Sequence, residues 1–137
     1  MRHGSTCLAL VLVGVVGLQV RAADKPPADY QAAMKDLGAF AQGIDKAVMA
    51  DDFAAVSKYA GAVKGDFELV EKFWSAKAQD AAKIAQAGGK AAADLSAVAD
   101  VKSREGVEYA VKQIRDLCAT CHMAHRETMP DGTFQIK

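Results

Sequence analysis

Proline and cysteine are scarce in this chain of 137 residues, which contains only three of each. Aromatic residues make up only 7% of the sequence, and the 17 basic side chains are balanced by 17 acidic ones. A balanced charge without a basic cluster excludes the electrostatic footprint of a nucleic-acid-binding protein. The scarcity of proline, and a hydrophobic half that is rich in alanine, favour helices over sheets. The length predicts a single domain.

The longest apolar run lies near the N-terminus. The 14-residue stretch "CLALVLVGVVGLQV" follows a short segment with Arg2, and Val20 and Ala22 then occupy the small-residue positions read by a signal peptidase. The run is shorter than the roughly 20 residues of a membrane span, although an uncleaved anchor is the alternative. We therefore expect residues 1–22 to be a cleaved signal peptide, residues 23–137 to form the mature domain, and the protein to be periplasmic without a stable membrane span.

Export changes the meaning of the cysteines. Cleavage would remove Arg2, Arg21 and Cys7, which leaves 15 basic against 17 acidic side chains, a net charge of −2. The remaining cysteines are Cys118 and Cys121, and a cysteine pair in an oxidising compartment usually forms a disulfide. The loop between these two is so short that a disulfide there would stabilise the fold poorly.

Hydrophobic spacing predicts three amphipathic helices in the first part of the mature chain. The first follows Pro26-Pro27, and its apolar residues recur at intervals of four and three. They are Tyr30, Met34, Leu37, Ala41, Ile44 and Val48. The second is capped by Asp51-Asp52. The third follows a break at "KGD" (residues 64–66), and its apolar residues begin with Phe67, Val70 and Trp74.

A fourth helix is predicted near the C-terminus. Ser103 is a suitable N-cap, and Glu105 lies in the first turn. We expect the helix to reach about Thr128, where "MPDG" stops it and "TFQIK" follows as an extended tail. No strand periodicity, internal repeat or low-complexity tract competes with this interpretation. Four amphipathic helices with short connections predict an all-α, antiparallel four-helix bundle.

Two adjacent glycines, Gly88 and Gly89, interrupt the third predicted helix. Each lowers helix propensity by about 1 kcal/mol relative to alanine. The pair could instead let a neighbouring helix or a flat ligand approach closely, because glycine has no side chain.

The segment from Cys118 to His122, "CATCH", is a Cys-x-x-Cys-His motif, the attachment signature of c-type haem. On a helix, two thiols about one turn apart can form thioethers with the two vinyl groups on one porphyrin edge. The adjacent histidine then presents its imidazole to the iron. The sequence therefore predicts one covalent haem c, attached to Cys118 and Cys121, with His122 as an iron ligand.

Two other sites could use the same residues. A thioredoxin-like dithiol would need a helix N-terminus after a strand, whereas this motif lies deep in the last helix. A zinc ion could be bound by Cys118, Cys121, His122 and His125, but one helical segment cannot easily place four ligands around it tetrahedrally. Haem is favoured over both.

A Cys-x-x-Cys-His motif on the last helix of a four-helix bundle resembles class II cytochrome c, the cytochrome c′ family. Arg126 lies four residues after His122, where the family usually carries a basic residue. Trp74 precedes Cys118 by 44 residues, close to an aromatic residue that often opens the third helix of relatives. The resemblance covers nearly the whole mature chain. Three features depart from it: His125 stands where relatives usually have Phe or Tyr, the segment between the first and third helices is shorter, and the "TFQIK" tail is unfamiliar in the family.

The resemblance implies that the first helix faces the other side of the iron. "AAMKDLG" is similar to the subgroup with methionine there, so Met34 is expected to bind iron and make it six-coordinate and low-spin. In other relatives the residue is apolar and the five-coordinate iron takes nitric oxide or carbon monoxide. Met34 would then only pack in the core. Arg126 is expected to contact a haem propionate or the His122 side, unless it is a solvated residue at the helix end.

Together these features predict a one-electron carrier and not an enzyme. His/Met ligation raises the reduction potential and leaves no open position on the iron. No Ser-His-Asp order, phosphate loop or second metal motif occurs in the sequence. The expected partners are redox proteins, and the resemblance also implies a homodimer as one arrangement. The alternatives are a five-coordinate, gas-binding cytochrome c′ and, if no haem is attached, a zinc-binding bundle.

Overall fold

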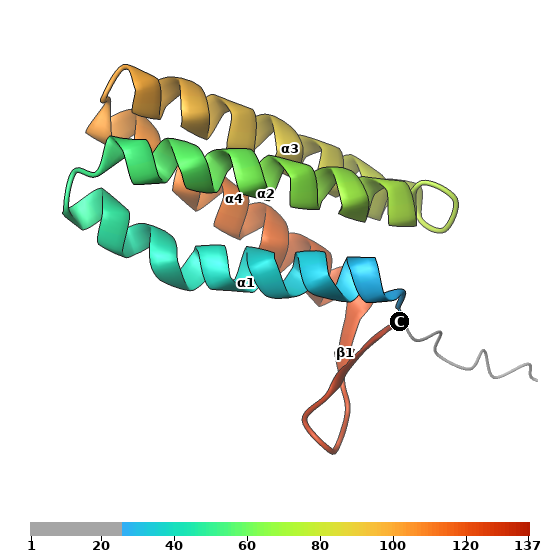
Figure 1. Ribbon diagram of the computed structural model, residues 1–137. Coiled ribbons are helices and arrows are strands. Elements are labelled where there is room, and N and C mark those ends of the chain that lie inside the picture. Colours follow the sequence, from blue (N-terminus) through green and yellow to red (C-terminus); the bar gives the residue numbers. More distant parts are fainter. Residues whose placement is uncertain (1–25) are drawn as a thin grey trace, which may run out of the picture.

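The computed structural model describes residues 26–137, so the predicted signal peptide and Cys7 lie outside the described residues. Four helices of 22 residues each lie side by side and pack against one another (Figure 1). They are α1 (Ala28–Met49), α2 (Phe53–Trp74), α3 (Gln79–Asp100) and α4 (Arg104–His125). The prediction of four helices is therefore confirmed. None of the helices in this part of the chain is both long and apolar enough to cross a membrane.

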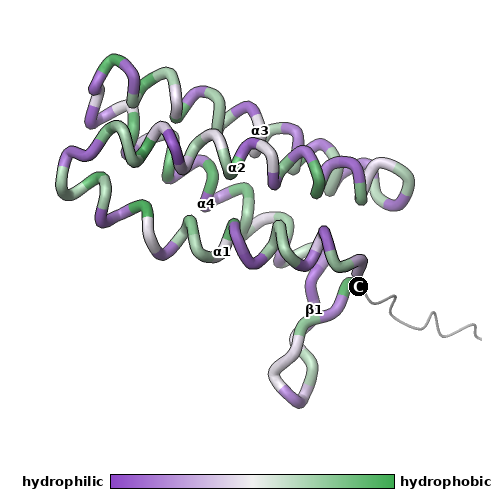
Figure 2. The backbone as a smooth tube through the Cα atoms, viewed as in Figure 1, coloured by the Kyte–Doolittle hydropathy of each residue, from purple (hydrophilic) through white to green (hydrophobic). Residues whose placement is uncertain are grey.

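The helices pack through hydrophobic stripes, but the stripe of α1 differs from the predicted one. Leu37 and Ile44 are buried as predicted, whereas the other buried positions of α1 are Ala33, Phe40 and Ala47. Figure 2 shows hydrophobic and hydrophilic residues alternating along each helix, and the hydrophobic ones meet in a single core. Ile44, Leu95 and Ile114 are among its largest fully buried side chains. No polar or charged residue between positions 26 and 137 is fully buried, so burial of apolar surface is the main force holding the helices together.

Two predicted N-caps are confirmed. Asp52 Oδ1 accepts a hydrogen bond from the backbone N–H of Ala55 (3.0 Å), at the start of α2. Ser103 Oγ accepts one from the backbone N–H of Gly106 (3.2 Å), at the start of α4. These bonds satisfy N–H groups that have no partner within the helix.

The predicted break between the second and third helices is wrong. α2 continues through Gly65 as far as Trp74, and α3 begins only at Gln79. Phe67, Val70 and Trp74 extend the buried stripe of α2 without a change of phase. The burial of these side chains outweighs the cost of about 1 kcal/mol for a helical glycine.

The predicted end of the fourth helix is also wrong. α4 ends at His125, and Arg126 adopts extended backbone angles. The tail is not a free extension: β1 (Arg126–Thr128) pairs antiparallel with β2 (Phe134–Ile136) in a hairpin. Gly132, with a φ of 81°, supplies the left-handed residue that the turn requires.

α1 and α4 are the neighbouring helices that pack least closely, and space remains between them. α1 packs chiefly on α2, and α4 packs on α3, whereas α1 and α4 approach each other at few points. One side chain spans the gap: Arg115 Nη2 donates hydrogen bonds to the Ala41 carbonyl oxygen (2.8 Å) and to Asp45 Oδ2 (2.8 Å). The candidate site lies in the space between these two helices.

Candidate functional site

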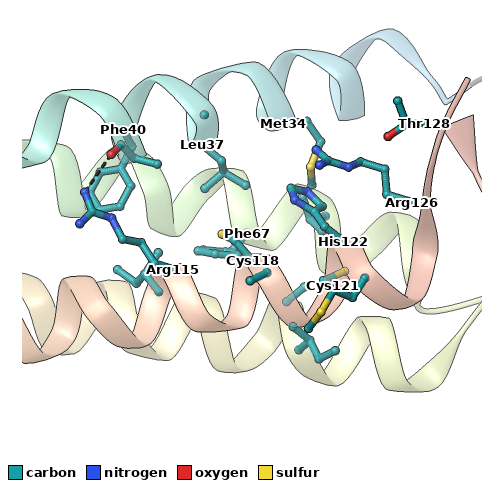
Figure 3. A pocket seen from close by; sticks show the side chains of 18 residues that line it. Met34, Leu37, Phe40, Phe67, Arg115, Cys118, Cys121, His122, Arg126 and Thr128 are labelled. Carbon is teal, nitrogen blue, oxygen red and sulfur yellow. Dashed lines mark hydrogen bonds between the residues drawn. The ribbon is translucent and has the colours of Figure 1, made fainter. Parts of the chain in front are cut away.

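A cavity of about 670 Å³ lies in the gap between α1 and α4, with residues of α2 and α3 also lining it. Its volume falls in the range of about 300–1,000 Å³ that is usual for small-molecule sites. The five residues predicted to bind haem all line it, although they come from distant parts of the sequence (Figure 3). They are Met34, Cys118, Cys121, His122 and Arg126.

Cys118 and Cys121 lie about one turn apart on α4, and both are free thiols of intermediate burial. Burial raises the pKa of the Cys118 thiol, and burial followed by the charge of Cys118 raises the pKa of Cys121. A thioredoxin-like thiol needs the opposite shift, toward the reactive thiolate. The surroundings of this pair therefore do not favour the dithiol alternative.

His122 follows directly in the last turn of α4, and its side chain points toward α1 (Figure 3). Burial lowers the pKa of His122, and the positive charge of Arg126 lowers it further. Both effects favour the neutral imidazole, which is the form that binds a metal.

Met34 faces His122 from the other side of the cavity. It is partly buried against the core, and its side chain extends from α1 toward α4 (Figure 3). Leu37, one turn further along α1, also lines the cavity. A second cavity of about 530 Å³ shares Met34, Cys121, His122 and Arg126 with the first. Met34 and His122 thus lie at the border of two cavities.

Arg126 reaches the cavity from the C-terminal hairpin. Its guanidinium carbon lies 4.2 Å above the centre of the Phe134 ring, a cation–π contact. Arg126 lies opposite Ile136, and Phe134 is two residues before Ile136 on the same strand, so Arg126 and Phe134 project from the same side of the hairpin. The backbone N–H of Lys137 donates to the His125 carbonyl oxygen (3.1 Å), which ties β2 to the end of α4.

Sequence reasoning missed the contribution of this hairpin to the site. Thr133, Phe134, Gln135 and Ile136 all line the second cavity. The alternation of polar and apolar residues from Thr133 to Ile136, directly after a Pro-Asp-Gly turn, is the signal that could have indicated a strand.

His125 has partners of its own, away from the first cavity. Its Nε2 lies at hydrogen-bond distance, 2.9 Å, from Asp80 Oδ2 of α3, and its ring centre is 4.9 Å from that of Trp74. The backbone N–H of Ala81 lowers the pKa of Asp80, and the bond to His125 contributes. Trp74 closes α2 and does not open a third helix, which corrects the position implied by the resemblance.

The zinc alternative finds no support in this geometry. Among residues 26–137, no group of three or more His, Cys, Asp or Glu side chains gathers closely enough to hold a metal ion. His125 is directed to Asp80 and does not join Cys118, Cys121 and His122. This arrangement agrees with the limit that a single helix places on tetrahedral coordination.

Comparisons of the chain with protein-family models, with curated proteins and with solved structures found no match. The functional assignment therefore rests on the residues of the site and on their arrangement.

Proposed function

We propose that this protein is an exported, monohaem c-type cytochrome of the cytochrome c′ type, which carries single electrons. One observation supports the proposal above all. The two thiols and the imidazole of the Cys-x-x-Cys-His motif line one wall of a cavity, and the Met34 thioether reaches it from the helix opposite.

The residues of the cavity fit a haem group. The volume is that of a small-molecule site, and aliphatic and aromatic side chains from all four helices form most of the lining. The polar and sulfur-containing groups are few: two thiols suited to covalent attachment, a neutral imidazole, two thioethers, two guanidinium groups and the hydroxyl of Thr128. Cysteine, histidine and methionine are the residues that hold haem in c-type cytochromes.

Each residue has a distinct part in this proposal. Cys118 and Cys121 would hold the porphyrin through thioethers, which would prevent loss of the group after export. His122 of α4 and Met34 of α1 would bind the iron. Arg126, held by Phe134, offers a cation to a propionate. Haem bound in this way would supply an iron that gains and loses one electron.

Six-coordinate iron favours electron transfer over ligand binding. With His122 and Met34 both bound, no position is open for a substrate, so we propose a carrier and not an enzyme. An antiparallel arrangement of the four helices, a periplasmic location after signal cleavage, and redox proteins as partners complete the proposal. A homodimer, which the resemblance to the family also implies, is compatible with it.

One feature favours a second candidate, a five-coordinate cytochrome c′ that binds nitric oxide or carbon monoxide. Besides Met34, α1 lines the cavity with Leu37 and Phe40, which are apolar. If Met34 packs aside, the α1 side of the cavity is an apolar pocket of the kind that accepts a small diatomic gas.

An absorption spectrum separates these candidates. The full chain, produced with c-type haem maturation, is purified and reduced, and its spectrum is recorded with and without carbon monoxide. We expect a sharp low-spin spectrum that carbon monoxide does not change. In Met34→Leu, which keeps an apolar side chain of similar size, we expect a high-spin spectrum that shifts on adding the gas.

Met123→Leu serves as the matched control, because this exposed methionine follows His122 on α4 and cannot reach the opposite face. A wild-type spectrum that shifts promptly with carbon monoxide would assign Met34 to packing and favour the gas-binding candidate. Purified chain without covalent haem would contradict both.

A further inference from the structure

Gly88 lies in the interior of α3, where glycine is less favourable than alanine. A Cβ atom added at Gly88 would lie 2.6 Å from both Cδ1 and Cζ of Phe67. Carbon atoms make favourable contact at about 3.5–4.0 Å, so the Phe67 ring could not stay where it is. Gly88 is therefore the position on α3 against which an aromatic ring of α2 packs.

The neighbouring glycine does not have this role. A Cβ at Gly89 would approach only the Cβ of Phe67, at 3.8 Å, which is an ordinary van der Waals distance. Of the two glycines, only Gly88 is required by the position of the ring.

Phe67 is also part of the candidate site. Only 4% of this residue is exposed, and it lines the cavity between α1 and α4 together with Val70, Ile84 and Ala85 (Figure 3). Because position 88 has no side chain, the ring lies closer to the backbone of α3 than a Cβ atom there would allow. A ring displaced by such an atom has to move away from this part of α3, and the cavity, which Phe67 lines and Gly88 does not, is open to it.

We propose that Gly88 is a positioning residue: it holds the Phe67 ring back against α3 and thereby keeps the cavity deep enough for a flat ring ligand. That this ligand is haem rests on the proposed function. The depth of the cavity then depends on a residue that binds no part of the ligand and has no side chain in the core.

The test compares Gly88→Ala with Gly89→Ala, its matched control, and with the double variant Gly88→Ala/Phe67→Leu. Both single variants gain the same helix propensity, but only the first meets the ring. Leucine at position 67 lacks the ε and ζ carbons that the new methyl group would strike, and its δ carbons can rotate away. Each full-length chain is produced with c-type haem maturation. We measure haem content per chain, the reduced spectrum, carbon monoxide binding and the thermal unfolding midpoint.

We expect Gly89→Ala to match the wild type in haem content, spectrum and carbon monoxide binding. Gly88→Ala is expected to lose at least half of its haem content, or to bind carbon monoxide where the wild type does not, and the double variant should recover the wild-type behaviour. If Gly88→Ala and Gly89→Ala give the same haem content, spectrum and carbon monoxide binding, the proposal is overturned. So would a lower unfolding midpoint with unchanged haem content, spectrum and gas binding, because Gly88 would then serve packing alone.

If Gly88→Ala yields no folded protein, the double variant decides the matter. Normal haem content in the double variant supports the proposal, and its failure to fold overturns it. The wild-type sample keeps the two proposals apart. Wild type without covalent haem contradicts the proposed function, whereas haem-loaded wild type with a normal Gly88→Ala variant contradicts only the role of Gly88.

Discussion

The pKa values of single residues at the site are shifted in the direction that favours the uncharged form. Burial raises the pKa of Cys118 and Cys121 and lowers that of His122. Burial acts in opposite directions on acids and bases because it disfavours whichever form is charged. The cavity wall thus presents neutral thiols and a neutral imidazole, and its charged groups are Arg115 and Arg126.

Asp66 of α2 shows the same effect outside the site. Burial raises its pKa, and the negative charge of Asp36 on α1 raises it further. Its ionised form is therefore disfavoured in the folded protein. The stability contributed by this group is fully present below its ordinary pKa of 3.8 and is lost as pH rises through the higher pKa of the folded state.

Replacing Asp66 with asparagine should consequently raise the thermal unfolding midpoint at neutral pH. The advantage over the wild type should shrink as the pH falls, and vanish below 3.8, where the wild-type carboxyl is also uncharged. Unfolding followed by circular dichroism at several pH values measures this. Asp36→Asn should give a smaller gain, because the charge of Asp36 is the lesser cause. A neutral-pH midpoint that does not rise in Asp66→Asn would contradict the prediction.

At the scale of elements, helix ends follow local chemistry that can be tested directly. The N-cap bond from Gly106 to Ser103 Oγ has no replacement in Ser103→Ala. We expect this variant to lose about 1 kcal/mol of unfolding free energy, the typical cost of removing such a cap. Urea denaturation measures the loss.

Ser103→Thr is the control, because threonine keeps the hydroxyl that accepts the bond. Its unfolding free energy should stay close to that of the wild type. If the alanine variant is as stable as the threonine variant, the hydroxyl contributes nothing at this helix end.

Two element boundaries could not be predicted from local patterns. Gly65 indicated a break, yet α2 continues because Phe67, Val70 and Trp74 are buried by neighbouring helices. The last helix was expected to reach Thr128, yet Arg126–Thr128 pairs with Phe134–Ile136. In both cases contacts between separate segments outweighed the propensity of the segment itself.

At the scale of the whole molecule, α1 and α4 pack less closely than the other neighbouring helices, and a cavity lies between them. Arg115 spans that gap with bonds to Ala41 and Asp45, and its side chain and that of Asp45 are 39% and 57% exposed. Ion pairs this exposed contribute little to stability, at most about 1 kcal/mol. The bridge can nevertheless limit how far α1, which carries Met34, moves from α4.

Arg115→Gln should therefore have little effect on the unfolding midpoint but loosen α1. In the haem-loaded protein we expect carbon monoxide, which leaves the wild-type spectrum unchanged, to displace Met34 at a rate that rapid mixing can measure. Lys112→Gln is the control, because Lys112 pairs with Asp116 on its own helix (2.6 Å) and does not reach α1. Equal rates in the two variants would show that the bridge does not restrain α1.

The sequence by itself determined what depends on near neighbours along the chain. The intervals of three and four residues determined the helical stripes, side-chain oxygens at Asp52 and Ser103 determined two helix starts, and the spacing of Cys118, Cys121 and His122 placed them together on one helix. Residue types and short spacings are sufficient for these features, because each involves at most a few turns.

Only the tertiary structure decided what joins distant segments. It placed Met34 of α1 across a cavity from His122 of α4, directed His125 to Asp80, and seated Phe67 on Gly88. It also folded the C-terminal tail against the site as a hairpin. These contacts depend on how whole helices lie against one another. That arrangement is set by the burial of every stripe at once and is not written in any single stretch of sequence.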